Sequence, residues 1–120
     1  MLSRVAENLY WMTRYLERAE NTARLINATS QVLLDLPRGA SFGWDVLIKV
    51  VGLDNLFNQH YQSHDEASVL RFLIGDDRNP GSIVSCIHCA RENSRTLREV
   101  LPRAAWEDRK STRLNSRSRL

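Results

Sequence analysis

The sequence predicts an all-α protein: a helical bundle with two long helices, at about residues 3–36 and 80–101, and short helices between them. No stretch alternates apolar and polar residues over a useful length, as a half-buried strand would. Glycine and proline are few, five and three residues, which suits long helices with short connections. In the first helix, apolar residues recur at alternating steps of four and three, the spacing that keeps side chains on one helix face: Val5, Leu9, Met12, Leu16, Ala19, Ala23 and Ile26.

The first long helix is expected to begin at Ser3, a good N-cap residue, and to end at Leu36. Pro37 and Gly39 follow and break the helix. A loop is therefore expected over residues 37–43.

Three short helices are expected next. The first begins at residue 44 and is stopped by Gly52, a favourable residue just after a helix. Its run VLIKVV is β-branched and also fits a strand, but the helical spacing of its apolar residues favours a helix. Asp54 and Asp65 are candidate caps for the next two helices, and Gly75 ends the third. Its expected core residues are Val69, Leu70, Phe72 and Leu73.

The second long helix has a clear start in the sequence. Asn79 followed by Pro80 matches a cap residue followed by proline at the first helical position. The helix is expected to continue to Leu101, because Pro102 breaks it. A further short helix is expected at residues 103–107.

The net charge of +3 and the pI near 9.2 come from the end of the chain. Residues 108–120 hold five basic residues and one acidic residue, whereas residues 1–107 hold 12 basic and 13 acidic residues. We therefore expect one domain at residues 1–107 and a disordered basic tail at residues 108–120. The string DRKSTRLNS in this tail also looks like a translated sequencing adapter, which favours an artefact over an arm that binds nucleic acid or anionic lipid. We expect no nucleic-acid partner for the near-neutral domain.

A polar stripe runs along the first helix beside its apolar face. Arginine suits fork-like binding of carboxylate or phosphate, so the stripe fits a charged ligand or a protein partner. The alternative is a solvated helix face, because Arg14–Glu17 and Glu20–Arg24 have the spacing of surface ion pairs. The spacing assigns no catalytic residue and leaves both interpretations open. The candidate binding residues are Glu7, Tyr10, Arg14, Glu17, Arg18, Glu20 and Arg24.

Two cysteines, Cys86 and Cys89, share a helix face, and with His60, His64 and His88 they suggest a zinc site. The second half of a zinc-ribbon pattern is missing, and buried cysteines are common in helices, so we predict no metal and no cofactor. Gly-rich phosphate loops and nucleophile motifs are also missing. The sequence has no secretory signal and no apolar run of membrane-spanning length, which predicts a cytoplasmic protein without membrane contact.

The opening MLSRVAENLYWMTRYLERAENTARL resembles the opening of the bacterial alpha-E domain family, a group of helical proteins of unknown function. Residues 68–73, 79–93 and 106–107 are also similar to the family, although Thr13 stands where its pattern has glycine. The resemblance stops at Asp108, and because family members are longer it implies an N-terminal fragment. In the opening it rests on Ser3, Arg4, Ala6, Glu7, Asn8, Leu9, Tyr10, Trp11, Met12, Arg14, Tyr15, Glu17, Arg18, Ala19, Glu20, Ala23 and Arg24.

The resemblance implies an accessory role. The genes of the family resemble part of a bacterial set that includes an ATP-grasp protein and a transglutaminase-like peptidase, which implies a protein partner of one of these kinds in making or processing a peptide or amide bond. We favour a binding module that holds its ligand with Glu and Arg residues. The alternative is an enzyme in which Glu7, Glu17 or Glu20 performs acid/base chemistry on an anionic or peptide-like substrate, which requires a carboxylate in a dry pocket. The sequence does not set the oligomeric state.

Overall fold

The fold consists of five α-helices joined by short connections. The computed structural model describes residues 2–37 and 43–100. These ranges contain helices, turns and loops but no strand, which confirms the all-α class, and the run VLIKVV forms part of a helix. The predicted helix at residues 103–107 and the tail at 108–120 lie outside the described residues. The helices span Leu2–Asp35 (α1), Trp44–Val51 (α2), Asp54–His60 (α3), Glu66–Ile74 (α4) and Ile83–Val100 (α5).

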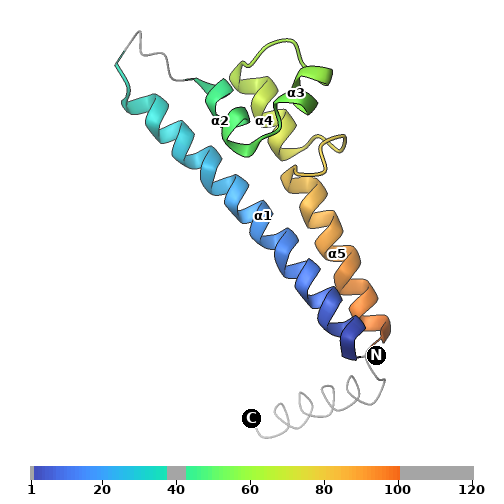
Figure 1. The fold of residues 1–120 in the computed structure, drawn as a ribbon. Coiled ribbons are helices and arrows are strands. Elements are labelled where there is room, and N and C mark those ends of the chain that lie inside the picture. Colours follow the sequence, from blue (N-terminus) through green and yellow to red (C-terminus); the bar gives the residue numbers. More distant parts are fainter. Residues whose placement is uncertain (1, 38–42, 101–120) are drawn as a thin grey trace, which may run out of the picture.

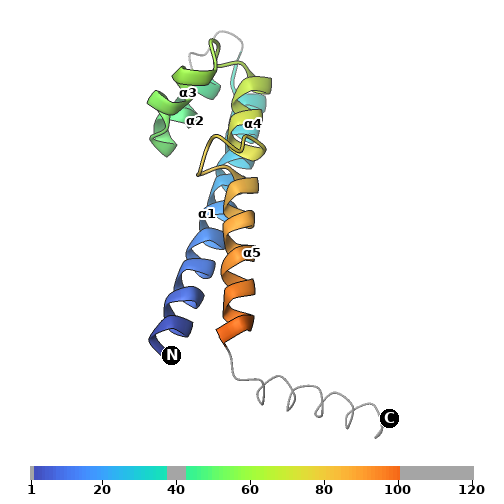
Figure 2. The same ribbon diagram turned by 90° about the vertical axis from the view of Figure 1, so that its right-hand side faces the viewer.

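The two long helices, α1 and α5, lie side by side and antiparallel (Figure 1, Figure 2). Ala19 of α1 and Ala90 of α5 are buried, and such small side chains let two helices approach closely. Each helix covers only one side of the other. Part of the predicted apolar face of α1 therefore stays open to solvent, with Leu9 and Leu16 43% and 47% exposed, and Ile87 of α5 is 42% exposed.

The hydrophobic core lies where the three short helices meet the C-terminal half of α1 (Figure 1). Leu25 and Ile26 of α1 pack against this core. Gly52 ends α2 with φ of 73°, a left-handed conformation that favours glycine. The buried core residues are Leu47, Ile48, Phe57, Val69, Phe72 and Leu73, which include three of the four core positions predicted for α4.

The start of α5 differs from the prediction by one short turn. The sequence places it at Pro80 with Asn79 as the cap, whereas the helix begins at Ile83. The Ser82 hydroxyl accepts a hydrogen bond from the Ser85 N–H at 3.2 Å, which is the contact expected of a helix N-cap. Residues 79–81 therefore form a turn that precedes α5 and is not part of the helix.

Candidate functional site

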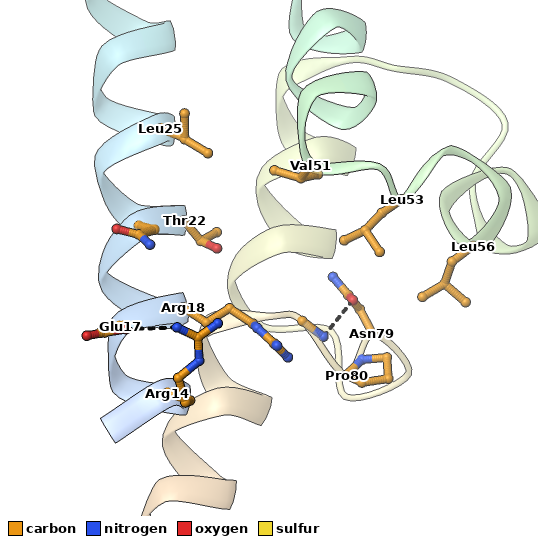
Figure 3. Close-up of a pocket in the computed structure, with 12 residues that line it drawn as sticks. Arg14, Glu17, Arg18, Thr22, Leu25, Val51, Leu53, Leu56, Asn79 and Pro80 are labelled. Atoms are coloured by element: carbon orange, nitrogen blue, oxygen red, sulfur yellow. Dashed lines mark hydrogen bonds and ion pairs between the residues drawn. The ribbon is translucent and has the colours of Figure 1, made fainter. Parts of the chain in front are cut away.

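A pocket of about 590 Å³ opens between α1 and the segments that surround the core (Figure 3). This volume lies within the range of roughly 300–1,000 Å³ that is usual for small-ligand sites. One wall is α1, the second is formed where α2 leads into α3, and the third is the turn before α5. The lining residues are Arg14, Glu17, Arg18, Asn21, Thr22, Leu25, Val51, Leu53, Leu56, Asn79, Pro80 and Gly81.

The charged part of the pocket comes from one face of α1. Arg14 and Glu17 form an ion pair at 3.5 Å, with side chains 53% and 55% exposed. Because water screens a pair this exposed, it contributes only about 0–1 kcal/mol to stability. The pair lies at the rim of the pocket, where both groups remain accessible to a ligand.

Arg18 extends from α1 toward the turn that carries Asn79 and Pro80 (Figure 3). Its guanidinium carbon lies 5.9 Å from the centroid of the Tyr15 ring, and it forms no ion pair with any described residue. Burial raises the pKa of the Cys86 thiol on α5, and the positive charge of Arg18 opposes this rise. Arg18 therefore places a guanidinium between α1 and the beginning of α5 without a carboxylate partner among the described residues.

The opposite part of the pocket is apolar. Leu25 from α1 faces Val51, Leu53 and Leu56 from the α2–α3 region (Figure 3). All four are half-buried, since each packs against the core on one side and lines the pocket on the other. The pocket thus has a charged part and an apolar part along the same helix.

The third wall is a turn fixed by Asn79, which is fully buried. The Asn79 side chain donates a hydrogen bond to the Phe72 carbonyl at 3.0 Å and accepts one from the Gly81 N–H at 2.9 Å. A Cβ atom at Gly81 would lie 3.4 Å from Asn79 Oδ1 and 3.6 Å from a methyl group of Leu53, which are ordinary contact distances, so Gly81 lies directly beside Leu53 of the second wall. These contacts tie the turn to the end of α4 and set its position opposite α1.

A buried carboxylate holds the start of the same loop. Asp76 is 6% exposed and accepts hydrogen bonds from Tyr61 Oη at 2.7 Å, from the Arg78 N–H and Nε, both at 3.0 Å, and from Arg78 Nη2 at 2.9 Å. The Arg78 guanidinium, followed by the Tyr61 hydroxyl, holds the pKa of the Asp76 carboxyl well below its usual range. Burial, followed by the hydrogen bond to Asp76 and the negative charge of Asp76, raises the pKa of Tyr61.

Arg78 also contacts His60, with Nη1 lying 3.2 Å from Nδ1 of the imidazole. Because arginine only donates hydrogen bonds, Nδ1 of His60 is the acceptor. The network therefore joins the end of α3 to the loop before α5. None of its residues lines the pocket, but it fixes the loop that continues into the third wall.

The chain matches a known protein family. The family model named Alpha-E, described as a predicted alpha-helical domain with a conserved ER motif, matches residues 1–119. The chain belongs to the Alpha-E family. Glutamate followed directly by arginine occurs once in the sequence, at Glu17–Arg18, so the ER pair lies in the charged part of the pocket. No curated protein and no solved structure matches the chain.

The match confirms the resemblance seen in the sequence. It runs over the predicted domain and continues to residue 119. The division of the chain into a domain at residues 1–107 and a tail at 108–120 stays a prediction.

The seven candidate residues of this Alpha-E domain fall into two groups. Arg14, Glu17 and Arg18 line the pocket. The other four are exposed and lie outside the pocket lining: Glu7, Tyr10, Glu20 and Arg24. Glu20 and Arg24 pair with each other, and the Tyr10 ring lies edge-on to Trp11 at 5.3 Å. The stripe is therefore part pocket wall and part solvated helix face.

Sequence reasoning missed most of the pocket. Asn21, Thr22 and Leu25 of α1 line the pocket, but none of them is among the candidate binding residues of the stripe. The α2–α3 wall and Gly81 lie between 26 residues (Leu25 to Val51) and 67 residues (Arg14 to Gly81) from the α1 lining in the sequence, and no spacing rule brings them to α1. The Asn79–Pro80 pair has a clear local signal, but that signal predicts a helix start and not a pocket wall.

The cysteine and histidine side chains of the Alpha-E domain have separate surroundings. Cys86 is buried with its Sγ 3.8 Å from the Pro80 carbonyl oxygen, and Cys89 is half-buried. His64 stacks on the Phe57 ring at 4.6 Å. Within residues 2–37 and 43–100, no three His, Cys, Asp or Glu side chains are grouped closely enough to hold a metal ion. Over the same ranges, none of the helices combines the length and apolarity needed to cross a bilayer.

Proposed function

We propose that this Alpha-E domain is a binding and accessory module that holds an anionic, peptide-like ligand in the pocket beside α1. The observation that carries the proposal is the Arg18 side chain, which extends into the pocket without a carboxylate partner among the described residues. Guanidinium groups bind carboxylates through paired hydrogen bonds, and such charge-assisted contacts are about twice as strong as neutral ones. Arg14 adds a second guanidinium on the same helix face.

The partner in this proposal is an ATP-grasp-type or transglutaminase-like protein in the bacterial cytoplasm. It rests on the gene association that the family resemblance implies. Enzymes of these kinds make or process amide bonds, so a module that binds a carboxylate-bearing peptide supplies or retains their substrate. A cytoplasmic location agrees with the two unpaired cysteines, which stay reduced there.

An enzymatic function receives no support from the geometry of the three glutamates. Glu7, Glu17 and Glu20 are all exposed to solvent. General acid/base catalysis at neutral pH relies on a carboxylate whose pKa is shifted by burial or by a neighbouring charge. We therefore propose the binding function alone.

Calorimetric titration of the full chain tests the ligand class. The probes are acetylated tripeptides with a carboxylate, either in a side chain or at the end of the chain, and uncharged tripeptides of the same size. We expect the acidic peptides alone to bind, and we expect Arg18→Ala to weaken binding about 10- to 100-fold, because a hydrogen bond to a charged group contributes roughly 1.5–3 kcal/mol.

Arg24→Ala is the matched control, because it removes the same side chain from the same helix outside the pocket. It should leave the affinity unchanged. Equal binding of acidic and uncharged peptides, or equal losses in both variants, would refute the proposed ligand class.

Co-purification tests the partner. The full chain is mixed with the ATP-grasp-type protein and the transglutaminase-like protein encoded beside an Alpha-E gene, and complexes are separated by size-exclusion chromatography. We expect one of the two proteins to co-elute with the chain, whereas separate elution of both would contradict the partner part of the proposal.

A further inference from the structure

We infer that the ligand of this pocket is the carboxyl-terminal end of a short peptide whose last residue has an apolar side chain. The inference rests on the proposed function and specifies its ligand class. It is carried by two features of one pocket: the Arg18 guanidinium, which has no ion pair with the described residues, and the apolar wall.

The charge of the pocket fits a single carboxylate. Arg14 and Arg18 contribute two positive charges and Glu17 one negative charge, and the remaining lining residues are uncharged. A net charge of one matches a monoanion. The two negative charges of a phosphate dianion would exceed the single net positive charge of the lining, and Glu17 at the rim would repel them. Arg18, which has no ion pair among the described residues, is the group that receives the carboxylate.

The apolar wall fits the side chain of the residue that carries the carboxylate. Leu25, Val51, Leu53 and Leu56 are half-buried, so their exposed surfaces face the pocket and gain from being covered. Thr22 and Asn21 lie between this wall and the arginines. An acidic or amide side chain placed against the four apolar residues would lose its hydration without a charged partner.

The length of the pocket fits a peptide better than a free amino acid. Arg18 and Leu25 are seven residues apart on α1, which corresponds to about 10 Å at 1.5 Å per residue. The side chain of the last residue packs on Leu53, which lies beside the turn that Arg18 faces (Figure 3), and the preceding residues run along α1 toward Leu25. An extended peptide covers about 3.3–3.6 Å per residue, so about three residues span the distance from Arg18 to Leu25. A single amino acid occupies only part of it.

Four probes titrated into the full wild-type chain by calorimetry test the inference: acetyl-Gly-Gly-Leu as the free acid, the same peptide as its amide, acetyl-Gly-Gly-Asn as the free acid, and free leucine. We expect the leucine acid to bind at least about 10-fold more tightly than its amide and than the asparagine acid, which has a similar size. We expect free leucine to bind more weakly than the leucine acid.

Leu53→Ser then tests the apolar wall, and Val50→Ser serves as the control because Val50 is 63% exposed and lies outside the pocket lining. Leu53→Ser should remove most of the preference for leucine over asparagine and leave the preference for acid over amide unchanged. Val50→Ser should preserve both preferences. Leu56→Ser, on the other side of the same wall, provides a second variant if Leu53→Ser lowers the unfolding midpoint seen by circular dichroism.

The outcomes separate this inference from the proposed function. If acidic tripeptides bind but leucine and asparagine acids bind equally, the inference is overturned and the proposed function stands. If free leucine binds as tightly as the tripeptide acid, the peptide part of the inference is overturned. If no acidic peptide binds, the proposed function fails together with the inference.

Discussion

Replacing Asp76 by asparagine tests the loop that forms the third wall of the pocket. Asp76 accepts four hydrogen bonds from Tyr61 and Arg78 and is nearly inaccessible to solvent. Asparagine has almost the same shape but only one acceptor oxygen. If that oxygen keeps the two bonds from the Arg78 backbone N–H and Nε, the new amide NH₂ group faces Arg78 Nη2 and Tyr61 Oη. The bond from Arg78 is then lost, and the Tyr61 hydroxyl can only accept from a neutral amide where it had donated to a carboxylate.

The expected cost of Asp76→Asn is about 2–3 kcal/mol of unfolding free energy. Each lost hydrogen bond to a charged group corresponds to roughly 1.5–3 kcal/mol. The bond from Arg78 counts for less, because the Arg78 side chain is 51% exposed and water compensates part of its loss. Replacement of the charge-assisted bond between the half-buried Tyr61 and the carboxylate by a neutral one therefore dominates the loss. Such a loss is a large share of a stability of about 5–15 kcal/mol, which is typical of small domains.

Urea unfolding followed by far-ultraviolet circular dichroism measures this cost. The pKa of Asp76 is lowered in the folded state, so its contribution is complete above the unfolded-state pKa of about 4 and is lost as the pH falls toward the lower folded-state pKa. The difference between wild type and variant should be constant from pH 7 to pH 5 and should shrink below about pH 4. Asp77→Asn, at the exposed neighbouring position, should change stability by less than about 0.5 kcal/mol. Equal effects of the two substitutions would refute the assignment of the buried network.

Three further substitutions probe separate elements by the same urea assay. Asn79→Ala should cost about 2–3 kcal/mol, because it leaves the Phe72 carbonyl and the Gly81 N–H without partners, and a loss below 1 kcal/mol would mean that the turn is held by other contacts. Gly52→Ala should cost about 1–2 kcal/mol because its φ is positive, so an unchanged midpoint would contradict the left-handed end of α2. Ile48→Ala should cost about 2–5 kcal/mol if Ile48 lies in the centre of the core, and a cost typical of surface sites would disprove that placement.

The fold was predictable because its helices are bounded by local signals. Gly52 closes α2 and Asp65 precedes α4 as the sequence suggested, and each of these depends on chemistry within a few residues. The start of α5 was misplaced because two cap-like residues follow each other. Asn79 Oδ1 accepts a hydrogen bond from the Gly81 N–H, as a cap would, but this turn is not continued as a helix; Ser82 caps α5 by accepting the Ser85 N–H, and its carbonyl accepts the Cys86 N–H. The Asn79–Pro80 signal therefore marks a turn one step before the helix.

The candidate site was predictable only on the side formed by α1. Helical spacing placed Arg14, Glu17 and Arg18 near one another, but it placed Glu20 and Arg24 near them as well. What separates the two groups is the wall opposite α1, which begins at Val51 and ends at Gly81. Its position follows from the packing of α2, α3 and α4 around the core, so the sequence of α1 contains no information about it.

This dependence on a distant wall distinguishes the two interpretations of the stripe. If Arg18 merely belonged to a solvated helix face, its surroundings would be set by α1 alone, and loosening the loop before α5 would leave its properties unchanged. If Arg18 binds a ligand between α1 and the Asn79–Gly81 turn, Asp76→Asn should weaken binding although Asp76 does not line the pocket. The Glu17–Arg18 pair would then bind its ligand in a site whose third wall is the loop before α5. The affinity of the pair for a ligand would therefore depend on the packing of the whole fold and not on α1 alone.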